Sequence, residues 1–175
     1  MSEDECHENY PVQTVILSNL LSLSIYGIGA YILAEVSVWL IIPYLMYCLW
    51  LEIRVIRRSC VNCYYYDKVC AFGKGKLCAL IFKRKGTPEL FAQDKVTWIQ
   101  LLPDFTISLT PLIAGIVLLV IDFSLLLLAL VVILGVLTFG GNAFVRGSFA
   151  CKFCKQREIG CPAEKLFNKE KAQQI

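Results

Sequence analysis

Residues 105–145 read FTISLTPLIAGIVLLVIDFSLLLLALVVILGVLTFGGNAFV, and Asp122 is the only charged residue among them. Residues 12–56 are nearly as apolar, and their only charges are Glu35, Glu52 and Arg54. A helix that crosses a bilayer needs about 20 apolar residues, so each stretch has room for two such helices. The sequence therefore predicts an all-α membrane protein, a four-helix bundle made of two tight hairpins. The expected spans are residues 12–34, 36–56, 103–121 and 123–145.

The overall composition supports a membrane protein, because 57% of the residues are hydrophobic and only 18% are charged. A soluble domain is about half apolar and a quarter charged. The apolar residues are concentrated in the two stretches, which excludes a single soluble core and also excludes disorder. No charged residue is expected near the middle of a span, which argues against an ion pump. The spans contain no histidine, so a haem held by two histidines inside the membrane is excluded.

The positive charges predict the orientation of the spans. All 17 Lys and Arg residues fall in two regions, one between Arg54 and Lys95 and one after Val145. Basic residues gather at the cytoplasmic ends of spans, and two spans separate the two regions. We therefore expect both regions and both termini to lie inside the cell, with the plasma membrane as the location. The N-terminal residues are acidic and lack Lys and Arg, unlike a cleavable signal peptide.

These boundaries divide the chain into five expected segments. Two are the helical hairpins, at residues 12–56 and 103–145. The other three are an acidic cytoplasmic tail at residues 1–11, a cysteine-rich cytoplasmic loop at 57–102 and a cysteine-rich cytoplasmic tail at 146–175. Within the loop, Leu90, Phe91 and the stretch Trp98–Leu102 are expected to form a short helix at the membrane interface.

A C-x2-C-x6-C pattern occurs twice in the chain, and we call each occurrence a cysteine hook. The first hook, residues 60–70, contains Cys60, Cys63 and Cys70, and the second, residues 151–161, contains Cys151, Cys154 and Cys161. Each hook follows the second span of a hairpin. This matched placement predicts a parallel internal repeat, whose symmetry would bring the hooks together beneath the bundle.

The hooks are typical of a metal site. The cytoplasm is reducing, which disfavours disulfides and favours metal binding or redox chemistry. A CxxC turn directs two sulfur atoms at one point, which suits a tetrahedral metal. We expect zinc, with an iron–sulfur cluster as the alternative, although the spacing matches neither ferredoxin pattern. The expected metal ligands are Cys60, Cys63, Cys70, Cys78, Cys151, Cys154 and Cys161.

Two ligand arrangements remain open. In the first, the two CxxC pairs share one ion. In the second, which the repeat favours, each hook holds its own ion, with Cys78 completing the first site and Cys6 or His7 completing the second. Cys48 lies within a span and is expected to be an apolar packing residue.

The sequence contains no Ser–His–Asp set and no paired carboxylates, so we expect a protein without catalytic activity. The leading hypothesis is a small membrane protein whose zinc sites have a structural or partner-docking role. The alternatives are an iron–sulfur or dithiol redox subunit and a protein that handles soft metal ions. The expected partners are a protein at the cytoplasmic face and an anionic inner leaflet, which the run Lys83, Arg84 and Lys85 would contact. The net charge is only +3, so no nucleic acid is expected.

Overall fold

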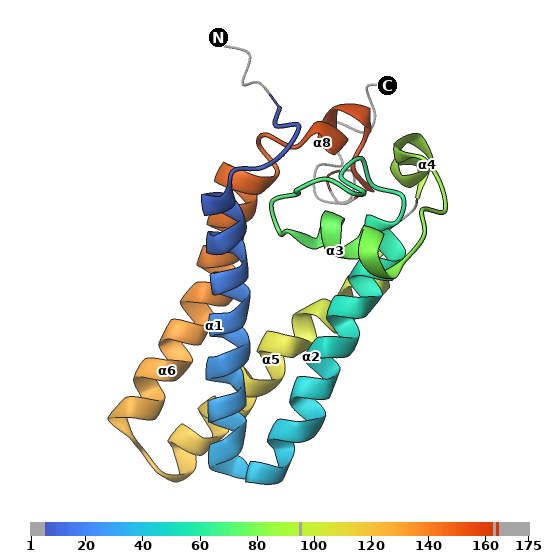
Figure 1. Ribbon diagram of the computed structural model, residues 1–175. Helices are drawn as coiled ribbons and strands as arrows, with labels where there is room; N and C mark the ends of the chain where they lie inside the picture. Colours follow the sequence, from blue (N-terminus) through green and yellow to red (C-terminus); the bar gives the residue numbers. More distant parts are fainter. Residues whose placement is uncertain (1–5, 95, 163, 165–175) are drawn as a thin grey trace.

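The computed structural model describes residues 6–94, 96–162 and 164. Within these ranges every regular element is a helix, and long helices run side by side to form a bundle (Figure 1). The first span is α1 (Val12–Val36). The second consists of a 3-10 turn, η1 (Val38–Leu40), then α2 (Ile41–Val55) and a π-helical turn, η2 (Ile56–Cys60).

The second half of the chain again contains two long helical runs. The third span is α5 (Trp98–Ile121). The fourth consists of α6 (Leu125–Gly135), π-helical η3 (Val136–Gly141), α7 (Asn142–Phe144) and π-helical η4 (Val145–Ala150). Three short helices lie at the end of the bundle that carries the hooks (Figure 1): α3 (Lys74–Ile81), α4 (Pro88–Gln93) and α8 (Lys155–Ile159).

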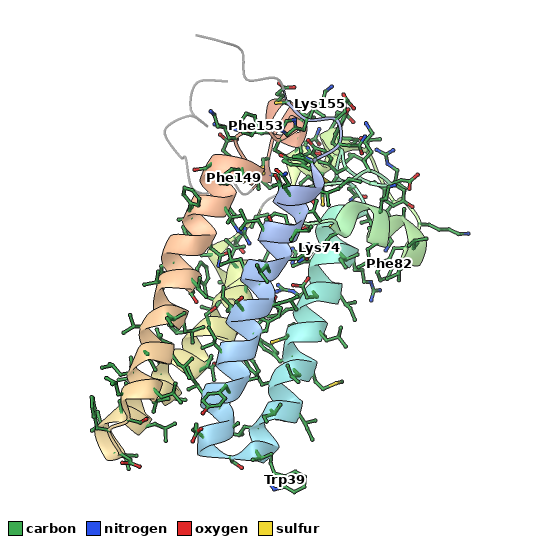
Figure 2. The ribbon with its side chains drawn as sticks, turned by 60° about the vertical axis from the view of Figure 1, so that its left-hand side comes forward. Trp39, Lys74, Phe82, Phe149, Phe153 and Lys155 are labelled. Carbon is green, nitrogen blue, oxygen red and sulfur yellow. The ribbon has the colours of Figure 1, made fainter. Side chains whose placement is uncertain are left out.

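Four helical runs are long and apolar enough to cross a membrane: Val12–Val36, Val38–Cys60, Trp98–Ile121 and Leu125–Ala150. The prediction of an all-α protein with four potential membrane spans is thereby confirmed. Large apolar side chains such as Val120 remain exposed on the outside of these helices, as expected of surfaces that face lipid. Figure 2 shows Trp39 at one end of the bundle and Phe153 and Lys155 at the other.

The core lies between the four spans, and α1 has its most extensive contact with α5. Ile32 and Leu134 are completely buried there, and Cys48 packs in the same core, as its apolar setting predicts. Small residues permit the close approach of the helices. A Cβ atom on Gly29 would collide with the Tyr44 hydroxyl and come within 3.1 Å of Pro111 Cγ.

The third span begins earlier than the sequence predicts. Trp98–Leu102 were expected to form a separate interfacial helix, with the span starting at Pro103, but they are the first turns of α5. The cause is a capping box, in which the side chains of Thr97 and Gln100 each bind the other's backbone N–H. Leu90 and Phe91 form part of a separate short helix, α4.

Candidate functional site

The seven hook-region cysteines lie at the end of the bundle where the second and fourth spans finish. Cys78 is buried, Cys151 is exposed, and Cys60, Cys63, Cys70, Cys154 and Cys161 are half-buried. All are free thiols, as are Cys6 and Cys48. This end of the molecule therefore carries a concentration of reduced sulfur atoms.

The two CxxC turns have the same backbone hydrogen bonds. In the first hook, the N–H of Cys63 donates to the Cys60 carbonyl at 3.4 Å, and the N–H of Tyr66 donates to the Cys63 carbonyl at 3.1 Å. The second hook has both bonds at the equivalent positions: Cys154 donates to Cys151 at 3.4 Å, and Arg157 donates to Cys154 at 3.0 Å. A π-helical turn, η2 or η4, precedes each pair.

Buried Gln156 joins the second hook to the first. Its side-chain oxygen accepts a hydrogen bond from the Tyr64 N–H at 2.7 Å, and its Nε2 donates to the Pro88 carbonyl at 3.1 Å and the Gly160 carbonyl at 3.0 Å. Only 2% of Gln156 is exposed, so these bonds satisfy a polar group that would otherwise be costly to bury. Neither spacing nor periodicity points to Gln156, because its partners Tyr64 and Pro88 lie far away along the chain.

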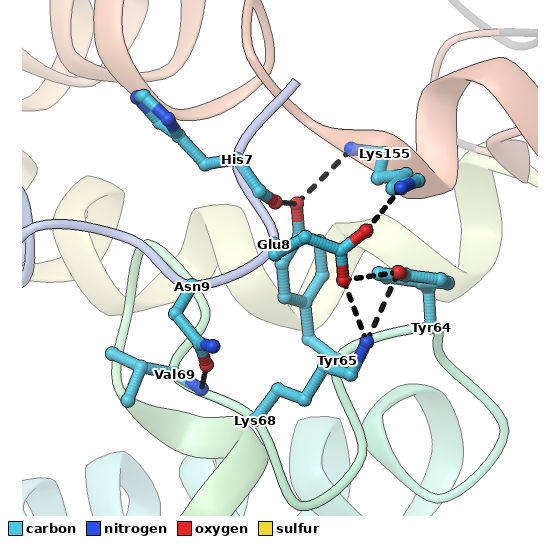
Figure 3. A network of polar contacts seen from close by, with 8 residues as sticks. All are labelled: His7, Glu8, Asn9, Tyr64, Tyr65, Lys68, Val69 and Lys155. Carbon is cyan, nitrogen blue, oxygen red and sulfur yellow. Dashed lines mark hydrogen bonds and ion pairs between the residues drawn. The ribbon is translucent and has the colours of Figure 1, made fainter. Parts of the chain in front are cut away.

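The N-terminal segment, residues 6–10, forms a clasp across both hooks (Figure 3). The Tyr65 hydroxyl donates to the His7 carbonyl at 2.6 Å and accepts from the Lys155 N–H at 3.0 Å. The N–H of His7 donates to the Phe153 carbonyl at 3.0 Å, and the Tyr10 hydroxyl donates to the Ala150 carbonyl. The sequence predicted an acidic tail here, with Cys6 or His7 as a possible fourth metal ligand, but not these contacts with both hooks.

The carboxylate of Glu8 adds an electrostatic contact to this clasp. It forms an ion pair with Lys155, and its Oε2 lies 2.9 Å from Lys68 Nζ and 2.6 Å from the Tyr64 hydroxyl (Figure 3). Hydrogen bonds from Lys155, Tyr64 and Lys68 lower the pKa of the Glu8 carboxyl to about 2. One acid therefore contacts side chains from both hook regions.

The thiols at the junction of the hooks occupy an apolar environment. Cys63, Cys70 and Cys154 each pack against a buried cluster formed by Tyr10, Tyr65, Ala71 and Ala150. Burial raises the pKa of the Cys63 thiol to about 11 and that of Cys154 to about 12. Without a cation these groups are thiols at neutral pH, and a bound metal would have to displace their protons.

Neighbouring sulfur atoms add to the effect of burial on these thiols. Cys70 raises the pKa of Cys63 and Cys78. Cys161 raises the pKa of Cys63, Cys151 and Cys154. Cys63 is therefore near cysteines of both hooks.

No three potential ligands converge to metal-binding distance anywhere in residues 6–94 and 96–162. The two N-terminal residues considered as a fourth ligand lie beside the second hook. Cys6 is next to Glu158, and the ring of His7 packs on Phe153 at a centroid distance of 5.2 Å. The predicted ligands thus lie at the same end of the bundle, but their side chains are not arranged at coordination distance from a common metal position.

The polar contacts of Glu52 inside the bundle were not predicted from the sequence. Glu52 of α2 accepts a hydrogen bond from the Tyr26 hydroxyl at 2.7 Å and forms an ion pair with Lys74 of α3. Lys74 follows the first hook, so neither helical periodicity nor motif spacing relates it to Glu52. The ion pair holds the start of α3 against the spans.

No family model, no curated protein and no solved structure matches this chain. Its function must therefore be inferred from the site.

Proposed function

We propose that this chain is an integral membrane protein whose two hooks bind zinc through cysteine thiolates at one end of a four-helix bundle. The observation that carries the proposal is that Cys63 of the first hook and Cys154 of the second pack against the same apolar cluster of Tyr10, Tyr65, Ala71 and Ala150. A closed thiolate site without redox chemistry is the commonest setting for structural zinc. The metal would fix the hooks as a rigid platform on which a soluble protein partner docks.

The repeated C-x2-C-x6-C pattern favours two adjoining sites over one shared site, because each hook supplies three cysteines at the same spacing. The first would use Cys60, Cys63, Cys70 and Cys78. The second would use Cys151, Cys154 and Cys161. Its fourth ligand would be a bridging Cys63 thiolate or a donor from the clasp, Cys6 or His7. Zinc binding would draw each set inward and release protons from the buried thiols.

The proposal includes a parallel repeat of two hairpins, each followed by a hook. The shared hydrogen bonds of the two CxxC turns and the π-helical turns before them support this repeat. It also places the hooks and both termini in the cytoplasm, because all the Lys and Arg residues lie in the two hook-bearing regions.

Metal analysis of the protein purified without oxygen tests the proposal. We expect colourless protein with about two zinc ions per chain for adjoining sites, or about one for a shared site. Cys6→Ala and His7→Ala identify a fourth ligand from the clasp, because only loss of a ligand lowers the zinc content. Cys48→Ala is the matched control, since Cys48 lies in the core of the spans.

Brown protein containing stoichiometric iron and sulfide would overturn the zinc assignment. The hooks would then hold an iron–sulfur cluster, and the chain would be an electron-transfer subunit. Protein that binds no metal under these conditions would contradict the metal-binding role altogether.

A further inference from the structure

Helix α3, which follows the first hook, has one buried and one exposed face. Gly75 and Cys78 are buried, whereas Leu77, Leu80 and Ile81 are 45%, 84% and 59% exposed. The exposed three have the spacing i, i+3 and i+4, so they form one apolar stripe on the helix surface. Such a stripe requires an apolar environment.

α3 is firmly attached to the second span. The Cys78 thiol donates to the Ile56 carbonyl at 3.8 Å, and the Tyr66 hydroxyl donates to the Phe82 carbonyl at 2.9 Å. Gly75 allows the helix to lie directly on the first hook, since a Cβ atom there would collide with the Tyr65 carbonyl oxygen. The exposed stripe is therefore presented in a fixed orientation.

Two contacts give the depth of α3 along the bundle. Lys74 forms its ion pair with Glu52, which lies eight residues, or about 12 Å, before the end of the second span at Cys60. Asn19 donates to the Phe72 carbonyl at 3.3 Å, and Asn19 lies seven residues, or about 10 Å, inside the start of α1.

These depths place the start of α3 below the ends of the spans. A helix of 25 residues such as α1 is about 37 Å long, whereas the hydrocarbon layer is about 30 Å thick. The ends of the helix therefore project only a few ångströms beyond that layer on each side. Figure 1 shows α3 beside the upper end of α2, while α4 and α8 lie higher.

A run of positive charge follows the apolar stripe. Lys83, Arg84 and Lys85 are all exposed, and the sequence has no acidic residue between Asp67 and Glu89. In a membrane leaflet the phosphates lie directly outside the acyl chains. The basic run lies directly beyond the apolar stripe of α3, so the two parts of this surface match the two layers of the leaflet.

We propose that α3 is embedded in the bilayer, with Leu77, Leu80 and Ile81 in the acyl chains and Lys83, Arg84 and Lys85 on the phosphates of anionic phospholipids. The proposal rests on the membrane placement of the four spans. It makes the first hook part of the membrane surface instead of a freely suspended loop.

Photo-crosslinking in anionic vesicles tests the acyl-chain contact. A diazirine amino acid replaces Leu80 in the full-length protein, reconstituted in phosphatidylcholine with phosphatidylglycerol. The positive control is Val132, an exposed residue of α6 seven residues inside the fourth span, and the negative control is Glu89, an exposed residue of α4. We expect lipid adducts at positions 80 and 132 and none at position 89.

Each outcome has one meaning. Adducts at 132 without adducts at 80 would overturn the embedding of α3, and a covalent dimer at 80 would overturn it in favour of a second copy of the chain. Absence of lipid adducts at 132 would contradict the membrane placement of the spans themselves, on which both proposals depend.

The headgroup contact has a separate test. Native mass spectrometry of protein released from the same vesicles measures the phosphatidylglycerol retained relative to phosphatidylcholine. The triple change Lys83→Gln, Arg84→Gln and Lys85→Gln should lower this ratio at least about tenfold. The control is Arg157→Gln in α8, which pairs with Glu164 and should leave the ratio unchanged. An unchanged ratio in the triple variant would overturn the headgroup contact.

Discussion

Cys63 lies where the two hooks meet. Cys70 of its own hook and Cys154 of the other pack against the same buried cluster as Cys63 does. We expect Cys63→Ser or Cys154→Ser to lose metal and much of the thermal stability of the solubilised protein. The reason is that an incomplete site forfeits much of the ~10–16 kcal/mol apparent binding energy of a structural zinc ion. Zinc content and thermal unfolding measure both effects.

Cys48→Ala provides the comparison for these variants. It should cost only about 1–2 kcal/mol, a modest packing loss in the core of the spans, and it should leave the zinc content unchanged. Equal tolerance of substitution at Cys48, Cys63 and Cys154 would count against a metal role for the hooks.

Glu8 gives the clasp a dependence on pH. Its folded-state pKa is about 2, below the ordinary value of 4.5, so its contacts stabilise the folded protein above pH 4.5. This contribution is lost as the pH falls from 4.5 towards 2. We expect wild-type protein to melt at a higher temperature than Glu8→Gln at a pH of about 6, and the difference to disappear at a pH of about 2. A difference that stays constant with pH would show that the carboxylate does not stabilise the clasp.

At the scale of elements, two glycines of α1 provide a test of helix packing. Gly29 faces Tyr44 and Pro111, whereas a Cβ atom on Gly27 would have no neighbour within 4 Å. Gly29→Ala should destabilise the protein by about 1–3 kcal/mol through overpacking, and Gly27→Ala should not. Unfolding of both variants in detergent measures the difference, and equal stability would contradict the close packing of α1 on α2 and α5.

The ion pair between α2 and α3 can be tested by a double-mutant cycle. Lys74 and Glu52 are 22% and 27% exposed, so the coupling should fall below the 3–5 kcal/mol typical of a fully buried pair. We expect Lys74→Met and Glu52→Gln each to cost about 1–3 kcal/mol, and the double variant to cost less than their sum. Additive losses would mean that the two side chains do not stabilise each other.

At the scale of the whole molecule, the proposed orientation predicts where probes can reach. Reporters fused to either terminus should be found in the cytoplasm. A thiol reagent that cannot cross membranes should fail to label exposed Cys151 in intact cells, but should label it once the membrane is opened and a chelator has removed the metal. Labelling in intact cells would reverse the orientation.

The four spans could be predicted because their evidence is local. Residues 105–145 contain a single charge, Asp122. An apolar stretch of this length is typical of two membrane-spanning helices, since each needs about 20 residues. The third span was expected to start at Pro103, because Trp98–Leu102 were assigned to a separate interfacial helix. The capping box at Thr97 and Gln100 begins α5 earlier.

The contacts that join the hooks could not be predicted, because they depend on residues far apart in the chain. Gln156 bonds to Tyr64 and Pro88, and neither spacing nor periodicity identifies such a pair. The cysteine pattern did identify residues that lie together at one end of the bundle, such as Cys63, Cys70 and Cys154. Whether these thiols close around a metal ion stays a prediction.

The clasp described above also constrains how the molecule is made. Residues 6–10 bond to residues 150 and 153, near the far end of the chain. A ribosome releases these partners only after all four spans have emerged. The first hook is therefore made before the residues through which the clasp joins it to the second hook. Assembly of this end of the protein has to follow synthesis of both hooks, so the earliest residues of the chain find their partners late.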